Sequence, residues 1–278
     1  MTEVAMWVDG RLVDPSRPAL RPDDHALVGD GAFEAIKVLD GRPFALSRHL
    51  ARLRHSLSAL GIELELDRAH AAVAALMATP PARVSPAWLR ITVTGGSAPM
   101  GTAGIGTQPT MVATVAPMAP WPPTTRVVIA PWTRNEHAPT AGLKTISYAD
   151  NVIANRHAHR VGADEAIFAN TKGQLCEGTG SNVVVADGDA LVTPTLAAGC
   201  LAGVTRELLL EWLPDLLIEH DVPVDRLETA SEAFLTSTSR NVHPIACVGD
   251  SPLASAPGPL TRRALAVWER NAARDIDP

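Results

Sequence analysis

Lys144 is the residue whose type and neighbours most clearly suggest chemistry. Of the 24 lysines and arginines only three are lysines, at positions 37, 144 and 172, and the single tyrosine, Tyr148, follows Lys144 by four residues. An arginine cannot form a Schiff base because its guanidinium stays protonated, whereas a lysine amine can once burial lowers its pKa. Lys144 is therefore a candidate for covalent catalysis through its amine. The alternative is an ordinary exposed lysine in a loop.

Three further stretches carry groups that would complement such an amine. Glu177 stands just before a run of small residues that ends at Asn182. Gly203-Val204-Thr205 opens a predicted helix, whose free N–H groups and dipole would attract an anion. Four hydroxyl residues at positions 236–239 end a predicted strand, where they are placed to donate to a phosphate or a carboxylate.

Together these groups suit pyridoxal 5'-phosphate (PLP). That cofactor needs an amine to form an imine, a carboxylate to keep its pyridine nitrogen protonated and a cup for its phosphate. Each piece also has an ordinary interpretation. Glu177 would then be a surface turn residue, Thr205 only a helix N-cap, and the hydroxyl run a plain strand end. The residues alone leave these alternatives open.

The composition narrows the class of protein. The chain of 278 residues is 46% hydrophobic and 19% charged, as in soluble globular proteins. A net charge of −6 without a basic run argues against a nucleic-acid partner. The three cysteines include no C-x-x-C pair, so reduced thiols in a cytoplasmic protein are expected. No signal-peptide pattern and no apolar run of the ~20 residues that cross a bilayer are present, so no membrane partner is expected.

Two patterns that could indicate other ligands do not do so. His157 and His159 form the only tight histidine pair, but they fall in a predicted helix, where positions i and i+2 point to different faces. The glycine-rich stretch 95–101 lacks the G-x-G-x-x-G order and no helix pattern follows it. We therefore predict neither a metal site nor a dinucleotide site.

A proline-rich stretch divides the chain. Pro117, Pro120, Pro122 and Pro123 lie within seven residues and indicate a stiff linker. The predicted organisation is an N-terminal domain at 1–115, a linker at 116–124 and a C-terminal domain at 125–278. Both domains mix helix and strand signals, so an α/β or α+β fold is favoured.

Local patterns place the chemistry-bearing residues on these elements. An Asp-Gly turn predicts a hairpin over 7–13, and leucines at helical spacing predict a helix from the N-cap Ser47 to Gly61. The other predicted strands are 32–39, 88–94, 110–115, 126–130, 165–169, 181–185 and 233–235, and the other predicted helices are 67–78, 148–160 and 207–217.

Six ordered motifs give the chain a resemblance to a known family. They are Gly29-Asp-Gly-Ala-Phe-Glu34, His49-Leu-Ala-Arg-Leu53, Leu143-Lys-Thr145 with Tyr148, Glu177-Gly-Thr-Gly-Ser-Asn182, Gly203-Val-Thr-Arg206 and Thr236-Ser-Thr238. In this order they resemble the class IV aminotransferases, the fold-type IV PLP enzymes. That family includes branched-chain aminotransferases, D-amino acid and (R)-amine transaminases, and aminodeoxychorismate lyase. The resemblance implies a small N-terminal α/β domain and a larger C-terminal pseudo-barrel domain with PLP between them, in a homodimer.

The resemblance also implies roles for individual residues. Lys144 would form the Schiff base and move the proton, and Glu177 would pair with the pyridine nitrogen. Tyr148 would lie near the ring hydroxyl, with Arg134 as a second candidate. The remaining roles are phosphate binding by Arg52, the N–H groups of Val204 and Thr205, and Thr238; lining of the ring or support of Glu177 by Ser181 and Asn182; and substrate binding by Phe33, Ser239 and Arg240.

The implied reaction is a ping-pong transamination from an amino donor to a keto acid acceptor. D-amino acid enzymes of the family usually carry a tyrosine at the Phe33 position, and an arginine and a histidine in the loop that matches residues 99–102. This chain has neither in that loop. Another group must therefore bind a substrate carboxylate, or the substrate has none. Arg240, Lys37 and Arg134 are candidates, although Lys37 is expected to be an exposed strand residue.

Aminodeoxychorismate lyase, which releases 4-aminobenzoate and pyruvate, is the alternative. Its members often have hydroxyl residues just after the G-D-G-x-F segment, where this chain has Ala35 and Ile36. We therefore favour a transaminase that uses a D-amino acid or an (R)-amine.

Overall fold

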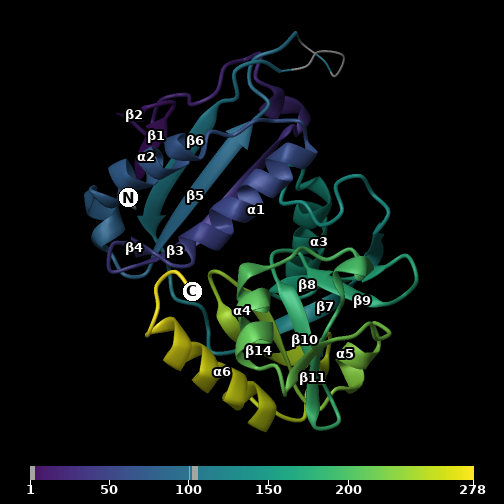
Figure 1. Ribbon diagram of the computed structural model, residues 1–278. Coiled ribbons are helices and arrows are strands. Elements are labelled where there is room, and N and C mark those ends of the chain that lie inside the picture. Colours follow the sequence, from purple (N-terminus) through teal and green to yellow (C-terminus); the bar gives the residue numbers. More distant parts are fainter. Residues whose placement is uncertain (1–3, 100, 102–105) are drawn as a thin grey trace. The chain divides into compact units, whose positions relative to one another are not determined.

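The computed structural model describes residues 4–99, 101 and 106–278. Its internal contacts divide the chain into two compact units (Figure 1). Unit 1 comprises the described residues of Met1–Pro120, with Leu143–Tyr148 and Asp277. Unit 2 comprises Trp121–Gly142, Ala149–Ile276 and Pro278. Both units combine helices with a sheet, so the predicted mixed α/β class is confirmed.

Among the described residues, unit 1 has a six-stranded antiparallel sheet in the order β2-β1-β6-β5-β3-β4. Helices α1 and α2 cover one of its faces (Figure 1). The elements are β1 Ala5–Val8, β2 Arg11–Val13, the short helix η1 His25–Val28, β3 Gly31–Leu39, β4 Arg42–Pro43, α1 Leu46–Ala59, α2 Leu66–Met77, the short helix η2 Pro80–Arg83, β5 Ala87–Thr94 and β6 Met111–Pro117.

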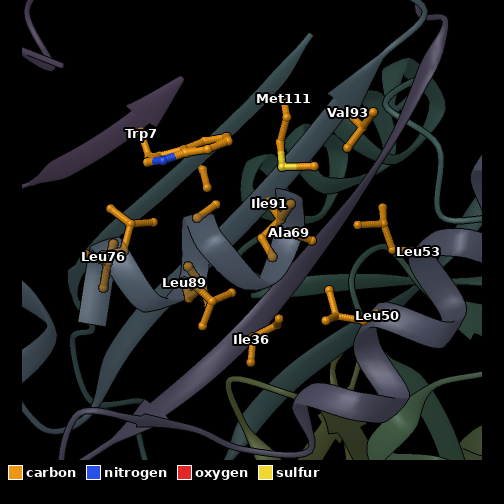
Figure 2. Close-up of a cluster of buried hydrophobic side chains, with 14 of the residues drawn as sticks. Trp7, Ile36, Leu50, Leu53, Ala69, Leu76, Leu89, Ile91, Val93 and Met111 are labelled. Atoms are coloured by element: carbon orange, nitrogen blue, oxygen red, sulfur yellow. The ribbon is translucent and has the colours of Figure 1, made fainter. Parts of the chain in front are cut away.

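The core of unit 1 lies on the helix-covered face of this sheet. Figure 2 shows Ile36, Leu89 and Met111 of the sheet with Leu50 and Leu53 of α1, and all five are at most 3% exposed. Successive side chains of a strand alternate between the two faces. The odd-numbered positions of β3 and the even-numbered positions of β5 therefore point to the face that α1 and α2 leave open.

Helix α1 begins differently from the prediction. Ala45, in a left-handed conformation with φ 52°, is the N-cap and has no side chain with which to cap the helix. Ser47, the predicted N-cap, lies within the first turn, where its N–H donates to the Asp277 carboxylate at 2.9 Å. The carboxylate of a distant residue thus occupies the helix start, a contact that local sequence does not predict. Gly61, with φ 73°, follows the helix end as predicted.

Unit 2 contains a nine-stranded mixed sheet that curls into a half-barrel. Its main path is β12-β11-β10-β13-β14-β7-β8-β9, and β15 pairs with β14. The elements are β7 Thr125–Arg134, α3 Ala149–Arg160, β8 Glu165–Asn170, β9 Leu175–Gly178, β10 Asn182–Asp187, β11 Ala190–Thr193, the short helix η3 Leu196–Ala198, α4 Val204–Trp212, β12 Leu217–Glu219, α5 Arg226–Thr229, β13 Ala233–Ser237, β14 Asn241–Val248, β15 Ser251–Pro252 and α6 Pro259–Ala272.

The predicted helix at 207–217 was wrong at both ends. Helix α4 starts earlier, at Val204, and ends at Trp212. Pro214 follows and cannot continue a helix, because it lacks an N–H and its ring collides with the preceding turn. Leu217 belongs instead to β12, which pairs with β11. The sequence analysis also missed α6, although Pro259 at its first position is a helix-start signal.

The segment that carries Lys144 packs with unit 1. The N–H of Phe33 donates to the carbonyl of Lys144 at 3.0 Å, and the N–H of Ile146 donates to the carbonyl of Gly31 at 2.9 Å. These bonds continue the ladder of β3 onto residues 143–148. The predicted C-terminal domain at 125–278 includes this segment, whereas unit 2 does not, because these bonds join the segment to unit 1.

Candidate active site

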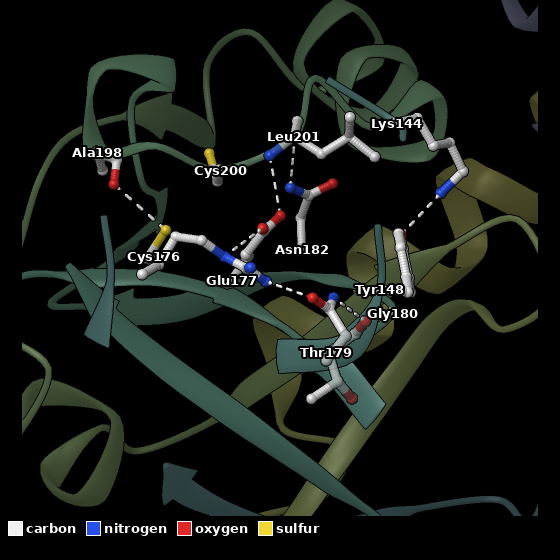
Figure 3. A network of polar contacts seen from close by, with 12 residues as sticks. Lys144, Tyr148, Cys176, Glu177, Thr179, Gly180, Asn182, Ala198, Cys200 and Leu201 are labelled. Carbon is white, nitrogen blue, oxygen red and sulfur yellow. Dashed lines mark hydrogen bonds and ion pairs between the residues drawn. The ribbon is translucent and has the colours of Figure 1, made fainter. Parts of the chain in front are cut away.

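Lys144 lies beside two aromatic rings in unit 1. Its Nζ is 3.5 Å from the hydroxyl of Tyr148, a contact seen in Figure 3, and 4.6 Å from the ring centre of Phe33. The Phe33 and Tyr148 rings meet edge to face at 5.1 Å. Phe33 is 6% exposed, whereas Lys144 is half-buried. The structure thus brings together three of the predicted residues, with the amine still partly accessible.

Arg90 completes this cluster and was missed by the sequence analysis. Its guanidinium carbon lies 3.8 Å from the ring centre of Phe33, and its Nε donates to the Thr92 hydroxyl at 3.1 Å. Burial lowers the pKa of Arg90, and the nearby Tyr148 acts in the opposite direction. No carboxylate pairs with Arg90 among the residues that the structure describes. Half-buried charges are usually paired, so an unpaired one suggests an anionic ligand.

Arg52 has the opposite kind of environment. Its Nε and Nη2 donate to the two oxygens of Glu34 at 2.8 and 2.7 Å, and His49 Nδ1 lies 2.7 Å from the same carboxylate. Burial alone would raise the pKa of Glu34, but the charges of Arg52 and His49 lower it to about 2. His49, Arg52 and Ser56 follow one stripe of α1, and Ser56 accepts the Lys144 N–H at 3.1 Å. This stripe therefore anchors the Lys144 segment and the predicted phosphate arginine together.

In unit 2, Glu177 is held at the end of β9 by two partners. Its Oε2 accepts from the N–H of Leu201 at 2.9 Å (Figure 3). Its Oε1 lies 3.3 Å from Nε of Arg134. Arg134 also donates to Asn151 at 3.1 Å, and its guanidinium lies over Phe168. These contacts fix the position of the Glu177 carboxylate. Arg134 is thus engaged with Glu177 within unit 2.

Asn182 supports the segment that leads into α4. Its Nδ2 donates to the carbonyl of Leu201 at 2.7 Å, so it and Glu177 bind the two sides of one loop residue. A Cβ on Gly203 would lie 1.9 Å from the Asn182 oxygen, so this position requires glycine. Gly203 caps α4 without a side-chain hydrogen bond. The first N–H groups of the helix, at Val204 and Thr205, therefore precede any intrahelical acceptor and suit an anion.

Ser181 and Arg240 meet at another carboxylate, which the sequence analysis did not consider. The Ser181 hydroxyl donates to Oε1 of Glu165 at 2.8 Å, and Nη1 of Arg240 lies 2.7 Å from Oε2 of the same residue. In the neighbouring turn, the hydroxyls of Ser237 and Ser239 lie 3.4 Å apart. Thr238, between these two serines, is half-buried.

Two other features bear on the search for a carboxylate ligand. Lys37 is 7% exposed, so its predicted exposure was wrong; burial lowers its pKa to about 8. The loop at 99–102 lies largely outside the described residues. No group of metal-ligating side chains occurs within the described ranges, and no helix of that part of the chain is long and apolar enough to cross a membrane.

The missed residues share a cause. Arg90 lies on a strand whose other face forms the core, and period-two alternation predicts which face it occupies but not what it contacts. Glu165 begins β8 and pairs with residues 15 and 75 positions later. Such pairs carry no local signal. An acid in a fully buried strand is the one clue, since acids are seldom buried unless paired.

The donor set fits PLP. Unit 1 offers a primary amine, and unit 2 offers a carboxylate and a helix start without a side-chain cap. These are the groups that the cofactor's carbonyl, pyridine nitrogen and phosphate require.

Comparison with known proteins identifies the family. The model of the family "Amino-transferase class IV" matches residues 31–248. The chain therefore belongs to the class IV aminotransferases, which are PLP-dependent enzymes of fold type IV.

Individual relatives cover most of the chain. A D-alanine aminotransferase of Bacillus licheniformis is 30% identical over 261 residues, 91% of this chain and 92% of the relative. A bifunctional aminodeoxychorismate lyase / D-amino acid transaminase of Mycobacterium tuberculosis is 33% identical over 237 residues, 75% and 77% of the two chains. The PLP-bound form of a hypothetical aminotransferase from the same organism superposes with a TM-score of 0.81 at 26% identity, covering 96% of this chain and 99% of that one.

Proposed function

We propose that the protein is a transaminase that moves an amino group from a D-amino acid or an (R)-amine to a 2-keto acid by a ping-pong mechanism. Two relatives whose names include D-alanine or D-amino acid transamination support this choice, at 30% and 33% identity. Within the proposal, the surroundings of Lys144 favour D-amino acids over simple amines, for the reason given next.

Arg90 is the observation that carries the substrate class. Its guanidinium lies on the same aromatic ring as the Lys144 amine, at 3.8 Å against 4.6 Å. An amino donor whose nitrogen takes the place of the Lys144 amine would bring an α-carboxylate within reach of a guanidinium, which binds carboxylates through paired N–H groups. Arg90 would thus take the place of the arginine and histidine missing from residues 99–102.

The roles proposed for the other residues follow from their contacts. PLP, when bound, supplies a carbonyl for the amine and a ring that accepts electrons from the substrate carbon. Lys144 would hold that carbonyl covalently, and its Nζ, once freed by the donor amine, would carry the proton that leaves the donor's α-carbon. Glu177 faces the pyridine nitrogen, supported by Arg134 and Leu201.

The phosphate and the ring have proposed ligands of their own. Arg52, the N–H groups of Val204 and Thr205, and Thr238 bind the phosphate, and Tyr148 binds the ring hydroxyl. Ser239 lines the substrate side with Phe33. Asn182 acts through Leu201 and Gly203, whose positions it holds.

Aminodeoxychorismate lyase activity is the second candidate, because one relative carries both activities in its name. Its substrate also bears carboxylates, so Arg90 would serve either reaction. Ala35 and Ile36, where lyases often have hydroxyl residues, support the transaminase. We also infer a cytoplasmic homodimer, on the family resemblance and the three free thiols; light scattering at several protein concentrations would test the dimer.

Lys144→Ala tests the proposed function. The wild-type protein should be yellow with bound PLP, and the variant should lose that colour and about 10³-fold or more of its activity, because no other lysine can replace the amine. Lys172→Ala, in an exposed turn, is the matched control and should keep both.

A substrate panel then separates the subclasses. We expect D-alanine to bleach the yellow colour, (R)-1-phenylethylamine to do so more slowly, and L-leucine to do so more slowly or not at all. A wild-type protein that never binds PLP would overturn the whole proposal. A protein inert to every amine that releases 4-aminobenzoate from aminodeoxychorismate would replace the transaminase by the lyase.

A further inference from the structure

Glu165 is a buried acid whose two oxygens are both used. It begins β8 and is 2% exposed. Its Oε1 accepts from the N–H of Gly180 and from the hydroxyl of Ser181, both at 2.8 Å. Its Oε2 lies 2.7 Å from Nη1 of Arg240. A Cβ on Gly178 would lie 2.4 Å from Oε1, so the turn can approach this carboxylate only because position 178 is glycine.

Arg240 is enclosed on its other side as well. Its side chain is 8% exposed, and its guanidinium carbon lies 4.1 Å from the ring centre of Trp121. Its N–H donates to the hydroxyl of Ser237 at 3.3 Å, which closes the turn at Ser237–Arg240. The charge of Arg240 is therefore neutralised by a carboxylate, and its flat face is covered by an indole.

The pair joins two neighbouring turns of the unit 2 sheet. Strands β10 and β13 are adjacent, with Asn182 opposite Thr236. The turn before β10 and the turn after β13 therefore lie at the same end of the sheet. The first turn follows Glu177 and ends at Asn182, whereas the second contains Thr238. Glu165 binds the first turn and Arg240 belongs to the second.

We propose that Glu165 and Arg240 form a brace that holds these two turns in the geometry that PLP requires, and that Arg240 is a positioning residue and not a ligand of the substrate. This inference rests on the proposed cofactor roles of Glu177, Asn182 and Thr238. A carboxylate ligand would have to displace Glu165 from Arg240, and would leave a buried acid without its partner. That loss makes substrate binding at Arg240 unfavourable.

The test is a double-mutant cycle read by cofactor affinity. Holoenzymes of wild type, Arg240→Met, Glu165→Gln and the double variant are stripped of cofactor, and the apoproteins are titrated with PLP. Each single variant leaves one buried partner uncompensated and should bind PLP about tenfold or more weaker. Because both residues act through the same pair, their losses should not add, and the double variant should bind PLP no more weakly than either single variant. The exposed Arg263→Met is the control and should match wild type.

Kinetics separate the brace from a substrate site. If Arg240 instead bound the donor's carboxylate, Arg240→Met would bind PLP within about twofold of wild type and would have a higher KM for D-alanine. Adding Glu165→Gln would then not lower that KM. That outcome overturns the proposal. If Arg240→Met does not fold, Glu165→Gln decides, because it keeps Arg240 in place: PLP binding about tenfold weaker supports the brace, and PLP affinity within about twofold of wild type overturns it. Failure of wild type to bind PLP would instead reject the proposed function.

Discussion

The arginine beside Lys144 and the arginine beside Ser181 share one feature and differ in another. Both stack on an aromatic ring, Arg90 on Phe33 at 3.8 Å and Arg240 on Trp121 at 4.1 Å. Arg240 also meets a buried carboxylate, as Arg52 does in unit 1. Arg90 has no acid partner among the described residues.

This difference separates two uses of a buried guanidinium. The charge of a paired arginine is neutralised within the fold. Removing that arginine leaves a buried carboxylate without a partner, which destabilises the folded state. An arginine without an acid partner contributes little to the stability of the fold, and its N–H groups remain available to a ligand. Arginine thus serves stability at Arg240 and recognition at Arg90, and Arg52 is proposed to do both, since it pairs with Glu34 and is a proposed phosphate ligand. Three experiments test that contrast, in order of expected effect.

Arg52→Met should give the largest change. It leaves Glu34, which is 0% exposed, beside His49 alone, and we expect the apoprotein to lose about 3–5 kcal/mol of its free energy of unfolding. Denaturant unfolding of the apoproteins measures this without the contribution of bound cofactor. Arg90→Met is the matched control and should change stability by less than about 1 kcal/mol. Equal losses in both variants would mean that the pairing does not decide stability.

Much of this arrangement could be predicted from local signals. The six motifs identified Lys144, Glu177 and the start of α4, because each motif is a short run of neighbouring residues. The turns and most strands follow from Asp-Gly pairs and alternation. Element ends failed where a distant group intervened, as when the Asp277 carboxylate took the place expected for Ser47 at the start of α1.

The partners of the arginines could not be predicted in this way. Arg52 meets Glu34 across 18 residues and Arg240 meets Glu165 across 75, and nothing in either sequence neighbourhood selects that partner. Sequence analysis therefore offered Arg240 as a substrate ligand and passed over Arg90. Only the register of β3 against β5, which sets Arg90 opposite Ala35, puts Arg90 one pair away from Phe33 on the open face.

Acid should weaken unit 1 through Glu34 and not through Arg90. The pKa of Glu34 is lowered to about 2, from 4.5, so the folded state holds this acid ionised more strongly than the unfolded chain does. Its contribution is present above pH 4.5 and is lost as the pH falls towards 2, with a slope of at most about 1.4 kcal/mol for each pH unit. We expect the wild-type apoprotein to lose more stability than Glu34→Gln between pH 5 and pH 3, by chemical denaturation. Arg90→Met should follow wild type, and parallel curves for wild type and Glu34→Gln would contradict this.

Arg90→Met should leave stability nearly unchanged and have the most specific effect, which falls on the substrate. Without the guanidinium, a D-amino acid loses the partner for its carboxylate, whereas the Lys144 amine and the cofactor residues are unchanged. We expect kcat/KM for D-alanine to fall about 10- to 100-fold, which is about 1.4–2.8 kcal/mol, with PLP affinity within twofold of wild type. Arg90→Lys should recover only part of the loss, because an ammonium cannot bind a carboxylate through two parallel N–H groups. A donor without a carboxylate, (R)-1-phenylethylamine, supplies the internal comparison. If its rate falls as far as that of D-alanine, Arg90 acts on Lys144 through Phe33 and not on the substrate.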